Sequence, residues 1–189
     1  MRRLAAGFLI LTAGCAAQPT GGTTAGAAPQ VVILVRHAEK ASETDQDPSL
    51  SASGRARAAA LAEALRDAAV SRVIVTHRRR TGETAEPLTT QHRLVPDTIA
   101  FGPNIADHVR EVARQVRASA GTTLVVGHSN TIPGIVTELT GVALPDLCDA
   151  DYSTLFVVSL PAAGRGRLIR SRFGAMDAGA ATCAGREAR

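Results

Sequence analysis

Two segments of this 189-residue chain each place a histidine directly after a short apolar run. Residues 31–35 lead into Arg36 and His37, and residues 124–127 lead into His128. A buried strand that ends on polar side chains is where open α/β sheets build their sites. Arginine presents a planar fork that matches phosphate oxygens, and histidine can act as a nucleophile. The two segments therefore predict phosphoryl chemistry.

A third segment has the same form. The apolar run 73–76 is followed by His77, Arg78, Arg79 and Arg80, which supply positive charge from another strand end. Because the carboxyl ends of parallel strands meet at one edge of a sheet, the three segments are expected to converge on one anion-binding site. For Arg78 and Arg79, a solvated basic turn is the alternative interpretation.

Four motifs extend this pattern: LVRHAEK at 34–40, LSASG at 50–54, RTGETA at 80–85 and VGHSN at 126–130. In this order, over residues 31–160, they resemble the histidine phosphatase superfamily, which also includes the phosphoglycerate mutases. The first and last of these motifs are the ones specific to this superfamily. The resemblance implies an activity that transfers a phosphoryl group through a phosphohistidine.

The resemblance also implies roles for individual residues. His37 would be the nucleophile, Arg36 would grip the transferring group beside it, and His128 would be the second histidine of the pocket. Arg80 matches the second arginine by register, with Arg79 as the alternative. Phosphoryl transfer needs mainly positioning and charge stabilisation, so these groups could act without a metal or another cofactor.

The proton donor to the leaving group is less defined by the motifs. Asp107 occupies a position comparable to the acidic residue of many relatives, and Glu39 is a rival. An aspartate near a helix start is also a common cap, and some small members of the superfamily have no clearly defined acid. Ser129 and Asn130 are expected to cap the helix after His128 and to help bind the phosphate.

The N-terminus has the form of a secretory signal. A basic start is followed by an apolar stretch, residues 4–13, that is too short to span a membrane. Residues 11–15, LTAGC, resemble a lipobox, which would place a lipid on Cys15; ordinary cleavage near Ala16 is the alternative. We expect a signal at 1–14, a lipidated Cys15 with a flexible tether to residue 30, a domain at 31–175 and a tail at 176–189. This would place the domain on the periplasmic side of a bacterial envelope.

Composition narrows the classes of partner. Removal of Arg2 and Arg3 with the signal reduces the net charge from +4 to +2, and the chain has one Tyr and no Trp. Nucleic-acid binding would favour a basic stripe with stacking aromatics, so it is not expected.

Cys148 and Cys183 remain as an even pair that could form a disulfide or stay as free thiols. Their spacing does not suggest a metal site. The oligomeric state is left open.

The apolar periods predict an α/β fold. Strands are expected at 31–35, 72–76, 123–127, 154–160 and 167–173, and helices at 53–69, 81–90, 105–118 and 130–139. Alternation of strand and helix predicts a three-layer sandwich: a mostly parallel central sheet with an antiparallel edge, and helices on both faces.

The sequence thus favours a small exported phosphatase. Its expected substrate is a small phosphorylated molecule, either a phosphomonoester or a phosphoramidate. A phosphomutase is less favoured because the short chain has no long insertion to retain an intermediate. A phosphate-binding lipoprotein without turnover is the alternative from another class. The motifs predict the reaction and leave the substrate open.

Overall fold

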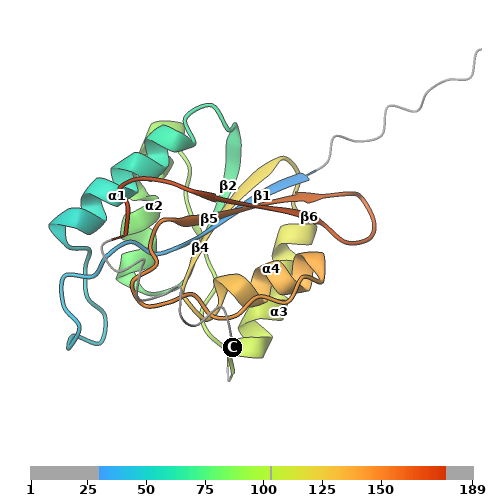
Figure 1. The fold of residues 1–189 in the computed structure, drawn as a ribbon. Helices are drawn as coiled ribbons and strands as arrows, with labels where there is room; N and C mark the ends of the chain where they lie inside the picture. The colour runs from blue at the N-terminus through green and yellow to red at the C-terminus, as the bar shows by residue number, and fades with distance from the viewer. Residues whose placement is uncertain (1–29, 103, 178–189) are drawn as a thin grey trace, which may run out of the picture.

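The computed structural model describes residues 30–102 and 104–177, which form one six-stranded sheet between two pairs of helices (Figure 1). The strand order is β3-β2-β4-β1-β5-β6. This is the predicted α/β sandwich, mostly parallel with an antiparallel edge.

The parallel part of the sheet holds four strands and the antiparallel edge holds two. The parallel strands are β1 (Gln30–Arg36), β2 (Val70–Val75), β3 (Asp97–Thr98) and β4 (Thr122–Gly127). The antiparallel strands are β5 (Thr154–Leu160) and β6 (Arg167–Arg172). Because β1 lies between β4 and β5, it is paired on both sides and occupies the centre of the sheet.

The helices are α1 (Ala52–Ala64), α2 (Arg79–His92), α3 (Ile105–Arg117) and α4 (Ile132–Thr140). Alternate side chains of β1 reach opposite faces of the sheet. Val32 and Leu34 pack in the cluster under α3 and α4, whereas Ile33 and Val35 pack in the cluster under α1 and α2. Burial on both faces explains why the central strands read as continuous apolar runs.

Several boundaries differ from the sequence predictions by one or two residues, one helix ends five residues early, and one strand was not predicted. The alanine-rich helix ends at Ala64 and not at residue 69, and β2 begins at Val70, two residues earlier than expected. Ala69 has a left-handed backbone, with φ of 49°, which turns the chain so that buried Val70 can pair with Thr122. Sheet pairing therefore overrides helix propensity here. Strand β3 was not predicted because its two residues are exposed and polar.

Helix α1 is fastened to the loop that follows β1. The Ser51 hydroxyl caps the helix by accepting from the Gly54 N–H at 3.0 Å, and the Ser51 N–H donates to the Glu39 carbonyl at 2.9 Å. A Cβ on Gly54 would lie 2.3 Å from that carbonyl oxygen. Glycine is therefore required at this close approach, which holds the chain two residues beyond His37.

Several sequence predictions fall outside the described residues. These are the signal, the lipidated Cys15, the tether before Gln30, and Cys183. Cys148 is disulfide-bonded. Among residues 30–102 and 104–177, no helix has the length and apolar character needed to cross a membrane.

Candidate active site

His37 and His128 lie side by side because their strands are paired. Arg36 and Gly127 are register partners in the parallel pair β1–β4, and the His37 N–H donates to the Gly127 carbonyl at 2.9 Å. Arg80 comes from the first turn of α2, after β2, the other neighbour of β4. The three strand ends thus converge at one edge of the sheet.

The tautomer of His37 is set by its neighbour in the chain. Its Nδ1 lies 2.8 Å from the Ala38 carbonyl oxygen. A carbonyl oxygen can only accept, so Nδ1 carries the proton and Nε2 keeps its lone pair. Burial is the main cause that lowers the pKa of His37 to about 3, opposed by the Ala38 carbonyl and assisted by the positive charge of Arg36 and Arg80. The ring is therefore a neutral base with a free nitrogen.

His128 is held in the opposite tautomer. The Arg80 guanidinium, which can only donate, lies with Nη2 3.4 Å from His128 Nδ1. Nε2 then carries the proton and donates to the Thr76 hydroxyl at 3.0 Å. Burial, followed by the electrostatic influence of His37 and Arg80, lowers the pKa of His128 to about 2. A phosphate dianion would offset these positive charges and favour a second proton on the ring.

Arg36 is clamped in a cage of carbonyl oxygens. Its Nη1 donates to the carbonyls of Cys148 and Asp149, both at 2.9 Å, and of Asp151 at 3.2 Å. The guanidinium carbon lies 4.2 Å from the centre of the Tyr152 ring. Arg36 is only 4 % exposed, yet its Nε has no hydrogen-bond partner among the described residues. A buried donor left without a partner indicates a site prepared for an anion.

Arg80, and not Arg79, lies in this site. Its side chain is 16 % exposed, and its Nη1 lies 3.6 Å from the Asp47 carboxylate. Its buried Nε has no hydrogen-bond partner in the part of the chain that the structure describes. Burial, then the neighbouring Arg78, lowers the pKa of Arg80. The Arg79 side chain is 61 % exposed and pairs with Glu83 at 3.3 Å on the helix surface. Arg80, the arginine that matches the superfamily motif by position, is therefore the one of the two that lies at the cavity.

Thr84, in the RTGETA motif, ties α2 to the histidine loop. Its hydroxyl accepts from the Ala38 N–H at 2.9 Å and donates to the Arg80 carbonyl at 2.7 Å. One buried hydroxyl therefore fixes the segments that carry the nucleophile candidate and the second arginine relative to each other.

These residues line an open cavity of about 440 Å³. Its lining comprises Arg36, His37, Lys40, Arg78, Arg80, Phe101, Ile105, His128, Ser129, Asn130 and Asp149. Among these described residues, the arginines and the lysine outnumber the one acidic residue, so the cavity is suited to an anion. Within the described part of the chain, no cluster of three or more His, Cys, Asp or Glu side chains is arranged to hold a metal ion.

The structure does not bring Asp107 into the cavity. Asp107 lies in the first turn of α3, where its N–H is capped by Asn104 at 2.8 Å and its carboxylate accepts from Asn104 at 2.7 Å and pairs with Arg110. The Glu39 carboxylate is also engaged elsewhere, because it forms a bidentate ion pair with Arg57. Both carboxylates therefore serve local structure.

The acidic residue among those that line the cavity is Asp149, which sequence reasoning missed. It stands in the acidic stretch DLCDAD at 146–151, which has no apolar period and no matching family motif. No signal in the sequence therefore pointed to it.

The predicted capping by Ser129 and Asn130 is wrong. Helix α4 begins at Ile132 with Thr131 at the N-cap, and the Thr131 hydroxyl accepts from the His128 N–H at 2.9 Å. The buried Thr131 therefore stabilises the turn that carries His128. Ser129 and Asn130 still line the cavity.

Part of the sequence matches the model of a known protein family. Residues 32–100 match the sequence model of the histidine phosphatase superfamily (branch 1), a stretch that includes Arg36, His37 and Arg80. No curated protein matches.

Solved structures share the fold. A structure of the protein histidine phosphatase SixA with tungstate is 18 % identical, with a TM-score of 0.61 over 75 % of this chain and 96 % of the other. Mycobacterial glucosyl-3-phosphoglycerate phosphatase is 16 % identical, with 0.60 over 73 % and 96 %. A putative phosphohistidine phosphatase SixA from Nakamurella multipartitia is 24 % identical, with 0.58 over 79 % and 99 %. The chain therefore shares the fold of these structures, and residues 32–100 match the superfamily's sequence model.

Proposed function

We propose that this protein is an exported phosphatase that hydrolyses a phosphomonoester or phosphoramidate through a phosphohistidine at His37. The observation that carries the proposal is the state of His37: a buried, neutral imidazole whose Nδ1 is bound to the Ala38 carbonyl, which leaves Nε2 free in a cavity lined by Arg36, Arg80 and His128. A site that only bound phosphate would have no need of a nucleophile.

In the first step, Nε2 of His37 attacks phosphorus in line, the new N–P bond forms, and the bond to the leaving group breaks. Arg36 and Arg80 donate to the equatorial oxygens through their Nε groups, which no described residue binds, and His128 donates once it has gained a proton. We assign the proton transfer to the leaving group to Asp149, the acidic residue among those that line the cavity.

In the second step, water attacks the phosphohistidine and the N–P bond breaks. Asp149, now a carboxylate, takes the proton from water, and inorganic phosphate leaves. The electron pair of the broken bond returns to Nε2, so His37 is regenerated as the neutral base. Water can enter because the cavity is open to solvent, which favours hydrolysis over a mutase reaction.

Export and lipidation at Cys15 are part of the proposal. The N-terminal sequence supports them, and so does the disulfide at Cys148, because disulfides persist in oxidising compartments such as the periplasm. The membrane would then be a partner only through the anchor, with the catalytic domain on the far side of the tether.

Hydrolysis of an aryl phosphate by a fragment that begins at Gln30 tests the activity. The assay contains a chelator and is repeated with His37→Ala. Turnover that survives chelation and is lost in the variant supports the proposal. An absence of turnover on a broad panel of phosphoesters, with phosphate still bound, would instead identify a binding protein.

A further inference from the structure

Asp177 lies far from the cavity in sequence, yet it is bound to the loop that holds Arg36. We propose that Asp177 is a positioning residue, which together with Arg57 fixes the loop of residues 148–153, called here the cage loop, in the conformation that orients Arg36 toward the substrate. The inference rests on the proposed function for its consequence in turnover, and on contacts of the described residues for its structural basis.

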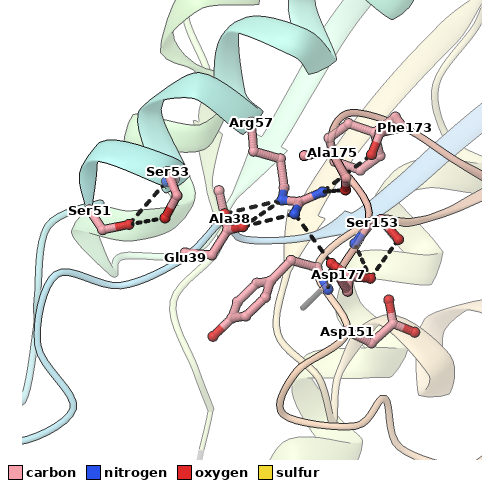
Figure 2. A network of polar contacts seen from close by, with 12 residues as sticks. Ala38, Glu39, Ser51, Ser53, Arg57, Asp151, Ser153, Phe173, Ala175 and Asp177 are labelled. Atoms are coloured by element: carbon pink, nitrogen blue, oxygen red, sulfur yellow. Dashed lines mark hydrogen bonds and ion pairs between the residues drawn. The ribbon is translucent and has the colours of Figure 1, made fainter. Parts of the chain in front are cut away.

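The Asp177 carboxylate is bound on every side by donors. Its side chain is 1 % exposed. It accepts from the Ser153 hydroxyl at 2.6 Å, from the N–H groups of Ser153 and Tyr152 at 3.2 Å, and from Arg57 Nη2 at 3.2 Å, and it pairs with Arg172 at 3.5 Å. Two successive backbone N–H groups of the cage loop therefore depend on one side chain from beyond β6 (Figure 2).

Arg57 connects this carboxylate to the other side of the site. The Arg57 side chain is 4 % exposed and donates to the carbonyls of Phe173 and Ala175, at 3.3 and 3.0 Å. It also forms the bidentate pair with Glu39, at 2.8 to 3.1 Å (Figure 2). The network thus spans from the residue two positions after His37, through α1, to the segment after β6.

The cage loop carries the groups that hold Arg36. The carbonyls of Cys148, Asp149 and Asp151 occupy Nη1, and the Tyr152 ring covers the guanidinium face. With Nη1 occupied, Arg36 can turn only its remaining donors to a phosphate. The orientation of these donors follows the position of the loop, and Asp177 fixes that position at Tyr152.

The charge balance explains why a carboxylate is required at residue 177. Five donor groups converge on its two oxygens, and two of them belong to the buried Arg57 and the partly exposed Arg172. An amide would retain one acceptor oxygen but would direct an NH₂ group at other donors. Asp177→Asn is therefore expected to release the cage loop while leaving the apolar core intact.

The test compares Asp177→Asn with Arg72→Gln. Arg72 forms an ion pair with Asp97 at 2.6 Å and donates to the Gln115 carbonyl at 2.8 Å, on β2 and away from the cavity lining. Both variants lose a charged network, so a general loss of stability appears in both. Each is assayed at a temperature at which circular dichroism shows it to be fully folded.

Two readouts follow the cage loop itself. Tyr152 is the single tyrosine of a chain without tryptophan, so tyrosine fluorescence reports on this loop directly. A titration with inorganic phosphate measures the anion site, whether or not turnover is found. We expect Asp177→Asn to change the fluorescence, and to weaken phosphate binding and lower kcat/KM by about 10- to 100-fold, as for a small misplacement of a catalytic group. Arg72→Gln is expected to leave all three unchanged.

Ser153→Ala provides a milder variant if Asp177→Asn does not fold. It removes a hydroxyl that donates to Asp177 at 2.6 Å and accepts from Arg172 at 2.8 Å, and it keeps the carboxylate of Asp177. It should change the same readouts in the same direction by a smaller amount. Wild-type fluorescence and phosphate affinity in a folded Asp177→Asn variant would overturn the inference. If the wild-type protein binds phosphate but shows no turnover, the proposed function fails, and the phosphate titration and fluorescence still decide the role of Asp177.

Discussion

The rings of His37 and His128 lie edge to face, with centroids 5.3 Å apart and an interplanar angle of 62°. Each ring follows one member of the register pair Arg36–Gly127, so the parallel pairing of β1 with β4 sets their separation. Neither ring is charged. Nδ1 of His37 is bound to the Ala38 carbonyl, whereas both nitrogens of His128 have protein partners, Arg80 at Nδ1 and Thr76 at Nε2. The arrangement places a nucleophile beside a second imidazole that can bind the phosphoryl group.

The first prediction separates two neighbouring arginines. Arg80→Ala is expected to lower kcat/KM by about 10²- to 10³-fold, because it removes a donor that stabilises charge in the transition state. Arg79→Ala should change it by less than about threefold, since an exposed helix ion pair contributes little. Steady-state kinetics on one aryl phosphate measures both. An equal loss in the two variants would argue against the assignment of Arg80.

The second prediction concerns the proton donor. Asp149→Asn should slow hydrolysis of alkyl phosphates by about 10²-fold or more, because an alkoxide needs a proton to leave. An activated aryl phosphate should transfer its phosphoryl group to His37, the first step, at nearly the wild-type rate. Asp107→Asn, at the start of α3, should show no such dependence on the leaving group.

The rates of alkyl and aryl phosphate hydrolysis, measured in both variants, show which variant depends on the leaving group. If Asp107→Asn showed the leaving-group dependence and Asp149→Asn did not, the proton-donor assignment would have to return to α3.

A third prediction follows from the lowered pKa of both histidines. In the unfolded chain they titrate near 6.5, whereas in the folded protein they stay neutral until about 3 for His37 and about 2 for His128. Below pH 6.5 the unfolded state binds more protons, so stability is lost as the pH falls from about 6.5 toward 3 and is fully present above 6.5.

Denaturant unfolding at a series of pH values measures this effect. The variant with both His37→Gln and His128→Gln should lose less stability than the wild-type protein between pH 6.5 and 4. Inorganic phosphate should stabilise the wild-type protein across this range, since it binds only the folded state. An unchanged pH slope in the double variant would contradict the assignment.

The fourth prediction concerns the lipid anchor. In a bacterial host, the full-length chain should incorporate a radiolabelled fatty acid and fractionate with the membrane. Cys15→Ala should abolish the label, because the lipid would be carried by that thiol. Labelling that persists in the variant, or a soluble periplasmic product from the full-length chain, would contradict lipidation.

The sequence predicted the sheet and its helices because the central strands are buried on both faces and read as unbroken apolar runs. It was wrong where pairing decided the boundary. Helix α1 ends early because Val70 is needed in β2, and β3 consists of two exposed residues with no apolar signal.

For the site, the sequence was informative where chemistry and strand ends coincide. Arg36, His37, Arg80 and His128 follow or flank strands, so their convergence could be predicted from topology. Asp149 and Asp177 could not be found in this way. One lies in an irregular acidic loop and the other beyond the last strand, and their roles depend on contacts between segments that are distant in the chain.

The most direct test of the account is to trap the phosphoenzyme. The protein is mixed with a phosphorylated substrate, quenched at alkaline pH, where a phosphohistidine persists, and digested for mass spectrometry. We predict one phosphoryl group, labile in acid, on the peptide that contains His37, and none in His37→Asn. Turnover without a phosphorylated intermediate, or with the phosphoryl group on His128, would contradict the account.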